Sequence, residues 1–169
     1  MPGFLQDGEG LRKRVYVDTT ILSYLAARRS RDLVRAAHQE LTWEWWETRK
    51  DRSDVYASDL VESEAGGGNP EAAARRLELL EGVPLLAAGQ EAKALSALLM
   101  EPGGLPEEAA DDAVHLALAT VHGMDVLLTW NRGHLANPVL REVLADRIRA
   151  AGYKPPVVCT PEELLEEWP

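Results

Sequence analysis

Short apolar runs alternate with longer stretches of helical periodicity along the chain, and this alternation limits the possible folds more than any other feature. Five runs have the length and composition of buried strands, and they cover residues 14–18, 55–58, 83–88, 125–130 and 155–159. The helical stretches between and after them cover residues 21–50, a segment starting at 60, then 71–82, 91–100, 109–123, 135–152 and 160–168. Strands that alternate with helices need crossover connections, so we predict an α/β fold with a mainly parallel sheet of four to five strands and helices on both faces.

Some helix boundaries are marked by specific residues. The first long stretch is expected to break near Arg29 to Asp32, and Ser58 or Asp59 can cap the helix that starts at residue 60. The last stretch opens with Thr160, a first-turn proline and Glu163, which is the arrangement of a capping box.

The 169 residues suit a single domain, which we place at residues 14–169 after a flexible extension at residues 1–13. No apolar run approaches the roughly 18 residues that a spanning helix needs, so we expect no membrane segment. The amino terminus lacks the apolar region of a secretion signal, so a cytoplasmic location is expected. Cys159 is the one cysteine, which excludes an internal disulfide and favours a buried structural thiol.

The chain is acidic, with a formal net charge of −10 from 28 acids and 18 bases. Such a chain has no general attraction to a phosphate backbone. A nucleic-acid substrate would therefore need a local basic patch or a basic partner. Candidate patches are residues 12–14, 28–31 and 49–50, although ordinary solvated surface is the simpler interpretation of each.

In parallel sheets, functional residues gather outside the carboxyl ends of the strands. Several polar residues are expected at that edge. They are Asp18, Glu62, Glu64, Asp111, Asp112 and Asn131. Clustered carboxylates raise one another's pKa values unless a cation neutralises them. Oxygen ligands without cysteines favour Mg²⁺ or Mn²⁺, and Mg²⁺ commonly acts on phosphate esters.

Three blocks of the sequence resemble PIN-domain proteins, especially the VapC-type toxins of bacterial and archaeal toxin–antitoxin pairs. The blocks are VYVDTTILSYL, SDLVESEAGGGNPEAAARRLELL and DDAVHLALATVHGMDVLLTWNRGHLANP, and the similarity covers about residues 14–165. The resemblance implies a three-layer α/β/α fold, Mg²⁺- or Mn²⁺-dependent ribonuclease activity on RNA, a homodimer, and a cognate antitoxin protein that blocks the site.

The resemblance also implies the site residues. Asp18 matches the first acid of the family and Thr20 the hydroxyl position two residues later. Glu64 matches the second acid, because it stands four residues before the Gly68-Asn69-Pro70 turn. Asp112 matches the third acid, with Asp111 as the alternative register.

The fourth family position usually holds Asp in a T-x-D pattern, and here Thr129-Trp130-Asn131 places an amide there. An amide can donate to a metal-bound water or ligate through its carbonyl, but it adds no charge. The TWN-x-x-H variant resembles a subtype of these toxins, so we expect activity to be kept, with a second metal less certain. Asp125 is expected at the opposite edge of the sheet in a structural role.

The expected mechanism is metal-assisted hydrolysis. Asp18 and Asp112 would be direct ligands, Glu64 would ligate through water or take a proton, and Thr20 with Asn131 would hold waters. Two alternatives are a catalytically silent PIN-like module that binds protein or RNA, and a phosphatase or phosphotransferase of another α/β family. The latter would need a second Asp at the position of Thr20.

The histidines and tryptophans add further expectations. His115 shares a helix face with Asp112, and a half-buried structural histidine is favoured there over a metal ligand. His134 follows Asn131 and is a candidate contact for the substrate phosphate. Trp43 and Trp46 stand three residues apart and are expected to pack on one face, with a dimer or antitoxin surface or base stacking as alternatives.

Overall fold

A computed structural model describes residues 12–167. Its centre is a sheet of five parallel strands in the order β3-β2-β1-β4-β5. The strands are β1 (Lys13–Val17), β2 (Ser53–Ser58), β3 (Leu85–Leu86), β4 (Val126–Leu128) and β5 (Val157–Cys159). The predicted α/β class and the parallel sheet are confirmed. Of the predicted amino-terminal extension, residues 1–11 lie outside the described residues.

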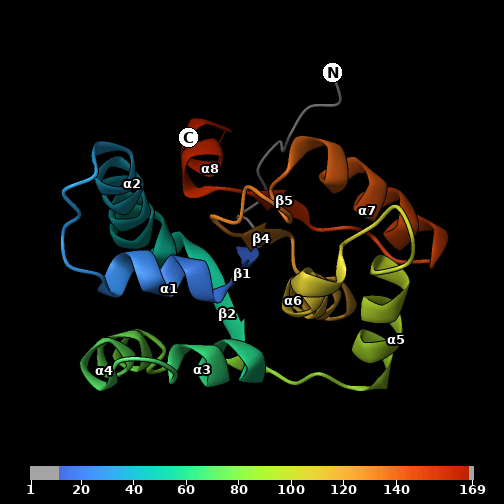
Figure 1. The fold of residues 1–169 in the computed structure, drawn as a ribbon, viewed down its shortest axis with the longest axis horizontal. Helices are drawn as coiled ribbons and strands as arrows, with labels where there is room; N and C mark the ends of the chain where they lie inside the picture. Colours follow the sequence, from blue (N-terminus) through green and yellow to red (C-terminus); the bar gives the residue numbers. More distant parts are fainter. Residues whose placement is uncertain (1–11, 168–169) are drawn as a thin grey trace.

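Eight α-helices within residues 12–167 surround the sheet. They are α1 (Thr19–Ala26), α2 (Leu33–Arg49), α3 (Asp59–Ala65), α4 (Pro70–Leu79), α5 (Gln90–Leu99), α6 (Ala110–Val121), α7 (Pro138–Ala150) and α8 (Pro161–Glu167). The helices from α1 to α4 lie on one side of the sheet together with α8, whereas α5, α6 and α7 cover the other side (Figure 1). The chain therefore forms three layers, as a sheet with crossover helices on both faces requires. None of the helices in the described residues is long and apolar enough to cross a membrane.

The strand order reverses at β1, which pairs with β2 on one side and β4 on the other. Val17 lies opposite Leu128 in the register of β1 and β4, so both strands end at the same level. The next residues, Asp18 and Thr129, then leave the sheet side by side, and the Asp18 amide still donates to the Leu128 carbonyl at 3.3 Å. A reversal of this kind leaves a crevice at the carboxyl ends of the strands, where parallel sheets place their ligands.

The core lies on both faces of the central strands. Val15, Tyr16 and Val17 of β1 are fully buried, as expected for a strand covered by helices on each side. On α6, four residues along one side of the helix are each buried: Ala113, Leu116, Ala117 and Thr120. Cys159 is also buried, and burial, followed by the charge of Glu163, raises the pKa of its thiol to about 12.

Three predicted strands are shorter than expected. Prolines without an amide hydrogen adjoin two of them, because Pro84 precedes β3 and Pro156 precedes β5. The third, β4, ends at Leu128, where the chain turns into the Thr129 to Asn131 loop. The predicted helix over 71–82 also ends early, at Leu79, and Gly82 lies in the following turn with a positive φ of 76°.

The expectation that Trp43 and Trp46 both pack into the core is wrong for Trp43. Trp45 and Trp46 are buried in the core, whereas Trp43 is 38% exposed. The inner face of α2 carries Thr42 and Trp45, which are three residues apart, and it packs against α1 and α8. Trp43 follows Thr42 by one residue and so points away from that face. The predicted break of the first long helix is confirmed, because α1 ends at Ala26 and α2 begins at Leu33.

Candidate active site

Asp18 lies at the junction of β1 and α1. It is the N-cap of α1, and its Oδ1 accepts hydrogen bonds from the Thr20 amide at 3.0 Å and from the Thr20 hydroxyl. The cap explains why a carboxylate follows an apolar strand. The Asp18 side chain accepts a hydrogen bond from an amide that the first helical turn leaves unpaired, and its negative charge is stabilised by the positive end of the helix dipole. Asp18 is only 2% exposed, and this burial raises the pKa of its carboxyl.

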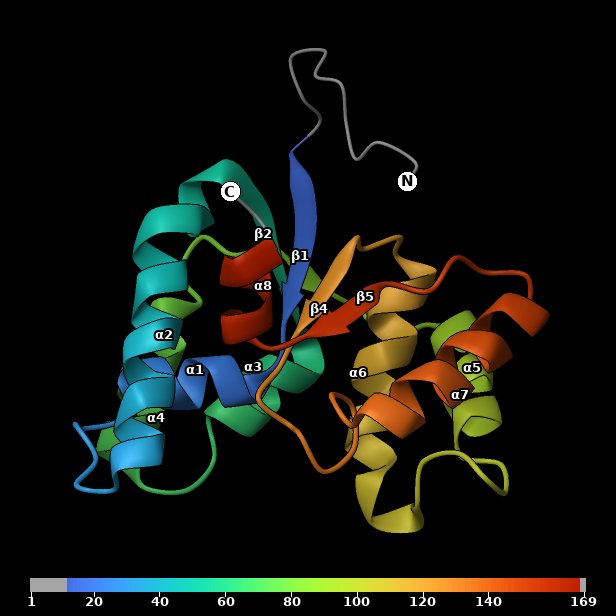
Figure 2. The ribbon, with the colours of Figure 1, turned by 90° about the horizontal axis from the view of Figure 1, so that it is seen from above.

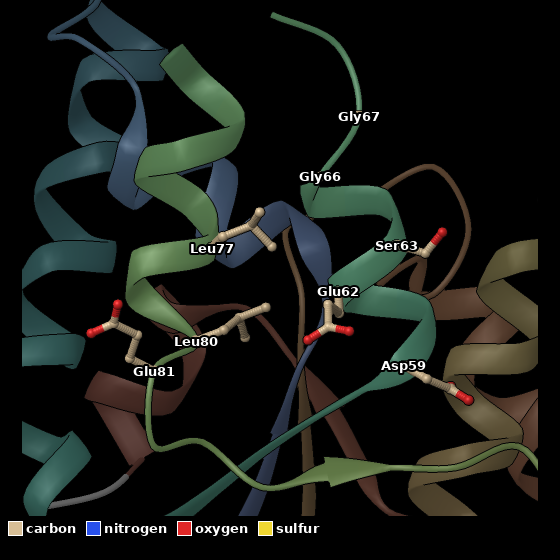
Figure 3. A pocket seen from close by; sticks show the side chains of 8 residues that line it. All are labelled: Asp59, Glu62, Ser63, Gly66, Gly67, Leu77, Leu80 and Glu81. Atoms are coloured by element: carbon tan, nitrogen blue, oxygen red, sulfur yellow. The ribbon is translucent and has the colours of Figure 1, made fainter. Parts of the chain in front are cut away.

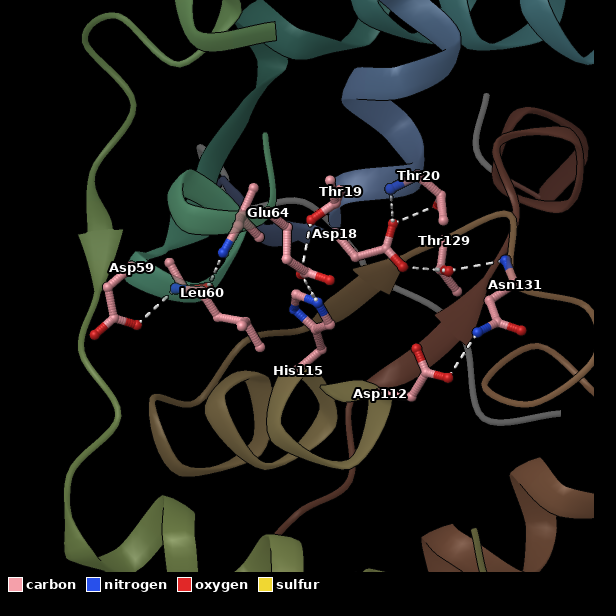
Figure 4. A network of polar contacts seen from close by, with 12 residues as sticks. Asp18, Thr19, Thr20, Asp59, Leu60, Glu64, Asp112, His115, Thr129 and Asn131 are labelled. Atoms are coloured by element: carbon pink, nitrogen blue, oxygen red, sulfur yellow. Dashed lines mark hydrogen bonds and ion pairs between the residues drawn. The ribbon is translucent and has the colours of Figure 1, made fainter. Parts of the chain in front are cut away.

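Two threonine hydroxyls join Asp18 to the loop after β4 (Figure 4). Thr129 donates through its hydroxyl to Oδ2 of Asp18, and the same hydroxyl accepts a hydrogen bond from the backbone amide of Asn131 at 2.9 Å. The Thr20 hydroxyl accepts from the Trp130 amide at 2.9 Å. The loop that carries Asn131 is therefore fixed directly to the Asp18 carboxylate.

Glu64 reaches the same place from the last turn of α3. Its Oε1 accepts from the Thr19 hydroxyl at 2.9 Å and lies 2.7 Å from Nε2 of His115. The other ring nitrogen of His115 lies 2.7 Å from the hydroxyl of Tyr16, which also contacts the Ser58 hydroxyl at 2.8 Å. A buried chain of polar groups thus runs from the interior of the sheet to the Glu64 carboxylate.

Asp112 lies in the first turn of α6 and faces the Asn131 loop. Its Oδ2 accepts a hydrogen bond from the side-chain nitrogen (Nδ2) of Asn131 at 2.8 Å and lies 3.3 Å from Nδ1 of His134. The side-chain oxygen of Asn131 accepts from the His134 backbone amide at 3.0 Å. Both ends of the Asn131 amide are therefore engaged, and this residue orients Asp112 in the structure.

Two acids that were considered from the sequence lie elsewhere. Asp111 is exposed, and its side chain forms no hydrogen bond or ion pair with the described residues, whereas Asp112 bonds to the Asn131 side chain and faces the site. Glu62 points into a groove between α3 and α4 that also has Leu77 and Leu80 along its wall (Figure 3). Asp125 lies at the opposite edge of the sheet, where it accepts a hydrogen bond from the Arg14 amide at 2.8 Å, as the predicted structural role requires.

Electrostatic interactions link the acids to one another. Burial raises the pKa of Asp112, and its negative charge also contributes to the raised pKa of Asp18. Burial lowers the pKa of His115, but the hydrogen bond to Glu64 and the charges of the three acids outweigh burial, so this pKa is raised. Burial raises the pKa of Glu64, but the His115 interactions outweigh that effect and leave it below its ordinary value. The acids around His115 therefore favour its protonated form.

The donor atoms allow a test of whether a metal ion fits. Oε2 of Glu64 and Oδ1 of Asp112 accept no hydrogen bond from the described residues. In the same part of the chain, no three Asp, Glu, His or Cys side chains stand close enough to form a ready metal cage. Hard carboxylate oxygens in this arrangement fit Mg²⁺ or Mn²⁺ held by one or two protein ligands with several retained waters.

The structure adds residues to the predicted site. His115 is expected to be half-buried, but it is only 3% exposed and it lies against Glu64. Its position three residues after Asp112 was the available signal. Thr19 and Thr129 were given no role, and nothing in their spacing indicates which carboxylate each would contact. That information depends on the pairing of β1 with β4 and the position of α3.

Comparison with known proteins bears on the fold. The sequence matches no protein-family model and no curated protein. Among solved structures, one match is the structure of VapBC2 from Rickettsia felis bound to a DNA fragment from their promoter. The TM-score is 0.56 at 12% identity, and the match covers 87% of this chain and 98% of that chain.

A second solved structure is equally similar. It is VapC20 of Mycobacterium tuberculosis, described as a sarcin-ricin loop cleaving toxin, with a TM-score of 0.55 at 14% identity. The match covers 82% of this chain and 95% of that chain. At such identities the two matches establish a shared fold over nearly the whole length of each protein.

Proposed function

We propose that this chain, which has the PIN-domain fold of the VapC toxins, is a metal-dependent endoribonuclease and the toxin of a toxin–antitoxin pair. The predicted three-layer fold is confirmed by the matches. The observation that carries the proposal is the convergence of Asp18, Glu64 and Asp112 at the reversal of strand order. These acids come from three separate segments, and Figure 4 shows them around the carboxyl ends of β1 and β4.

The acids would hold Mg²⁺ or Mn²⁺. Asp112 and Glu64 offer the carboxylate oxygens that are free of hydrogen bonds, and Asp18 has oxygens that retain lone pairs. One or two of these carboxylates would ligate the ion directly and the others would bind through its waters. A bound ion would lower the pKa of a coordinated water and offset charge on the phosphate that the water attacks.

The remaining residues would position these groups. Thr20 and Thr129 donate to Asp18 and hold its carboxylate in one orientation, and Asn131 with His134 does the same for Asp112. His115 holds Glu64 through Oε1, which leaves Oε2 to accept a proton from the attacking water. Asn131 would thus act through Asp112, since its own carbonyl is engaged by the His134 amide.

RNA is the proposed substrate, and a cognate antitoxin and a second copy of this chain are the proposed partners. The comparisons support this choice at the level of the neighbours: one is described as a toxin that cleaves the sarcin-ricin loop, and the other as VapBC2 on promoter DNA. Cleavage of phosphodiesters also suits oxygen-ligated divalent ions.

The decisive experiment compares Asp112→Asn with Asp111→Asn, which change the same charge on the same helix. RNA cleavage would be followed in Mn²⁺ with a labelled sarcin-ricin stem-loop and an unstructured oligonucleotide. We expect Asp112→Asn to lose about 100-fold or more in rate, since loss of an outer partner of a metal ligand alone costs about 10- to 100-fold. Asp111→Asn should cleave like the wild type, and equal rates in the two variants would contradict the assignment.

A catalytically silent module is the second candidate. It is favoured by the absence of a ready three-ligand cage in residues 12–167 and by the hydrogen bond between Glu64 and His115, which already engages one of the acids. Calorimetry distinguishes the two functions. A nuclease should bind Mn²⁺ in a manner that Asp18→Asn abolishes, whereas a silent module should give no heat that depends on Asp18.

A further inference from the structure

A cluster of arginines lies at the start of α2 and in the loop before it. Arg28, Arg29, Arg31 and Arg35 are exposed and fall within eight residues of a chain whose net charge is −10. The loop between α1 and α2 lies toward the same edge of the molecule as the carboxyl ends of β1 and β4, to one side of the candidate site (Figure 2). The cluster is therefore a local positive region on the edge that carries the acids.

Most of these guanidinium groups are not engaged by the protein itself. Arg29 lies 3.7 Å from the carboxylate of Glu40, with both side chains largely exposed. The side chains of Arg28, Arg31 and Arg35 form no hydrogen bond or ion pair with any described residue. Unpaired arginines that gather in an acidic chain are suited to bind an anion from outside, and their planar groups match phosphate oxygens.

His38 links α2 to the site. Arg35 and His38 stand three residues apart on α2 and so share a face of that helix, and Arg31 lies in the loop just before it. The His38 ring stacks on Trp130 with centroids 4.1 Å apart and an angle of 17° between the planes. Trp130 stands between Thr129 and Asn131 in the loop that is tied to Asp18, and its amide donates to the Thr20 hydroxyl.

The separation suits a nucleic-acid strand. The eight residues of α1 span about 12 Å at the usual helical rise, and the helix runs from Asp18 to the loop that carries the arginines. That length corresponds to only a few nucleotides. A strand cleaved at the acids would therefore reach the arginines with the nucleotides next to the scissile bond.

We propose that Arg28, Arg31 and Arg35 bind the backbone phosphates of the RNA strand as it leaves the acidic site past His38, whose ring stacks on the buried Trp130. This inference rests on the proposed function, because it names how that site holds its substrate. A nucleic-acid substrate of an acidic chain needs a local basic patch, and these arginines supply one. The net charge of the chain repels phosphates in general, whereas the arginine cluster attracts them at this place.

The test uses a double charge reversal and a control with the same change in net charge. Arg31→Glu with Arg35→Glu alters the arginine cluster. Arg52→Glu with Lys93→Glu alters two exposed bases outside it, just before β2 and on α5 across the sheet. Binding would be measured by fluorescence anisotropy with an unstructured 12-nucleotide RNA in EDTA, which stops metal-dependent cleavage.

We expect the dissociation constant of the arginine variant to rise about tenfold or more, and that of the control to stay within about twofold of the wild type. The slope of log affinity against log salt should fall in magnitude by about 1.4, which is about 0.7 for each lost phosphate contact to a single strand. Arg31→Lys with Arg35→Lys should bind within about threefold of the wild type. Equal binding by the two charge-reversal variants would overturn the proposal and leave the cluster as a surface for a protein partner.

A small diester separates this inference from the nuclease function. Hydrolysis of bis(4-nitrophenyl) phosphate in Mn²⁺ depends on the acidic site and needs no extended strand. The arginine variant should keep that hydrolysis while its KM for RNA rises and its kcat stays near the wild-type value. If the wild type hydrolyses neither substrate, the nuclease function fails, and the anisotropy result still decides whether the arginines bind RNA.

Discussion

At the scale of single residues, the site is organised by hydroxyl groups as much as by acids. Asp18 is buried, and its two oxygens accept from Thr20 and Thr129, so the carboxylate keeps hydrogen-bond donors without access to water. The Thr129 hydroxyl has two roles, because it donates to Asp18 and accepts from the Asn131 amide. A buried polar group that loses such a partner bears its full desolvation cost.

Thr129→Val should therefore destabilise the protein by about 1–3 kcal/mol, because it leaves the Asp18 carboxylate and the Asn131 amide each short of one partner. Thr129→Ser keeps the hydroxyl and should stay within about 1 kcal/mol of the wild type. Urea unfolding of the three proteins measures the difference. If the valine and serine variants unfold at the same urea concentration, the hydroxyl has no such role.

At the scale of the elements, local signals predict where helices begin more reliably than where strands end. The capping box of α8 is confirmed: the Glu163 amide donates to the Thr160 hydroxyl at 3.2 Å, and the Thr160 amide donates to Oε1 of Glu163 at 3.2 Å. Caps are set by a few neighbouring residues, so they can be read from sequence. The length of β3 depends on its pairing with Ala57 and Ser58, which lie far away in the chain.

Glu163→Gln gives a prediction for α8 that depends on pH. Burial raises the pKa of Glu163, but Arg141, which pairs with it at 2.9 Å, and Thr160 outweigh burial and lower the pKa. Because the pKa of Glu163 is lower in the folded state than in the unfolded state, ionised Glu163 stabilises the fold. This contribution is complete at pH values above 4.5, the pKa of an ordinary glutamate, and it is lost as the pH falls through the pKa of the folded state. At pH 7 the free energy of unfolding of the wild type should exceed that of Glu163→Gln by less than about 1 kcal/mol, because the ion pair of Glu163 with Arg141 is partly exposed.

That difference should shrink as the pH is lowered below 4.5, and urea unfolding at a series of pH values measures it. Glutamine can still serve in a capping box, so the variant isolates the charge of Glu163 from its cap. Glu166→Gln makes the same change at an exposed position of α8 and should show no comparable pH-dependent difference. A difference that grows toward low pH would mean that the sign is wrong.

At the scale of the whole molecule, the sheet order brings together acids that are far apart in sequence. Asp18, Glu64 and Asp112 meet because β1 lies between β2 and β4, while α3 and α6 start or end beside the same edge. Burial raises the pKa of Asp18 and of Asp112, and the charge of Asp112 adds to this effect at Asp18, so the charged forms of these two acids oppose folding. A cation that binds only the folded arrangement should offset that cost and stabilise the protein.

Mn²⁺ should therefore raise the free energy of unfolding of the wild type, by about 2.7 kcal/mol at a concentration one hundred times its dissociation constant. Asp111→Asn should gain the same amount and Asp112→Asn much less. Urea midpoints with and without Mn²⁺ measure this gain independently of any activity. An equal gain in both variants would place the bound ion away from Asp112.

The sequence by itself determined the α/β class, the parallel sheet, most helix starts and the acids due at its carboxyl edge, because these follow from local periodicity, caps and strand direction. Only the tertiary structure decided that Asp112 faces the Asn131 loop while Asp111 points outward, that Glu64 meets His115, and that Trp45 is buried in place of Trp43. Those outcomes depend on the rotation of each helix about its own axis and on contacts across more than 50 residues for Glu64 and His115. Packing against distant partners fixes that rotation, and local sequence does not record it.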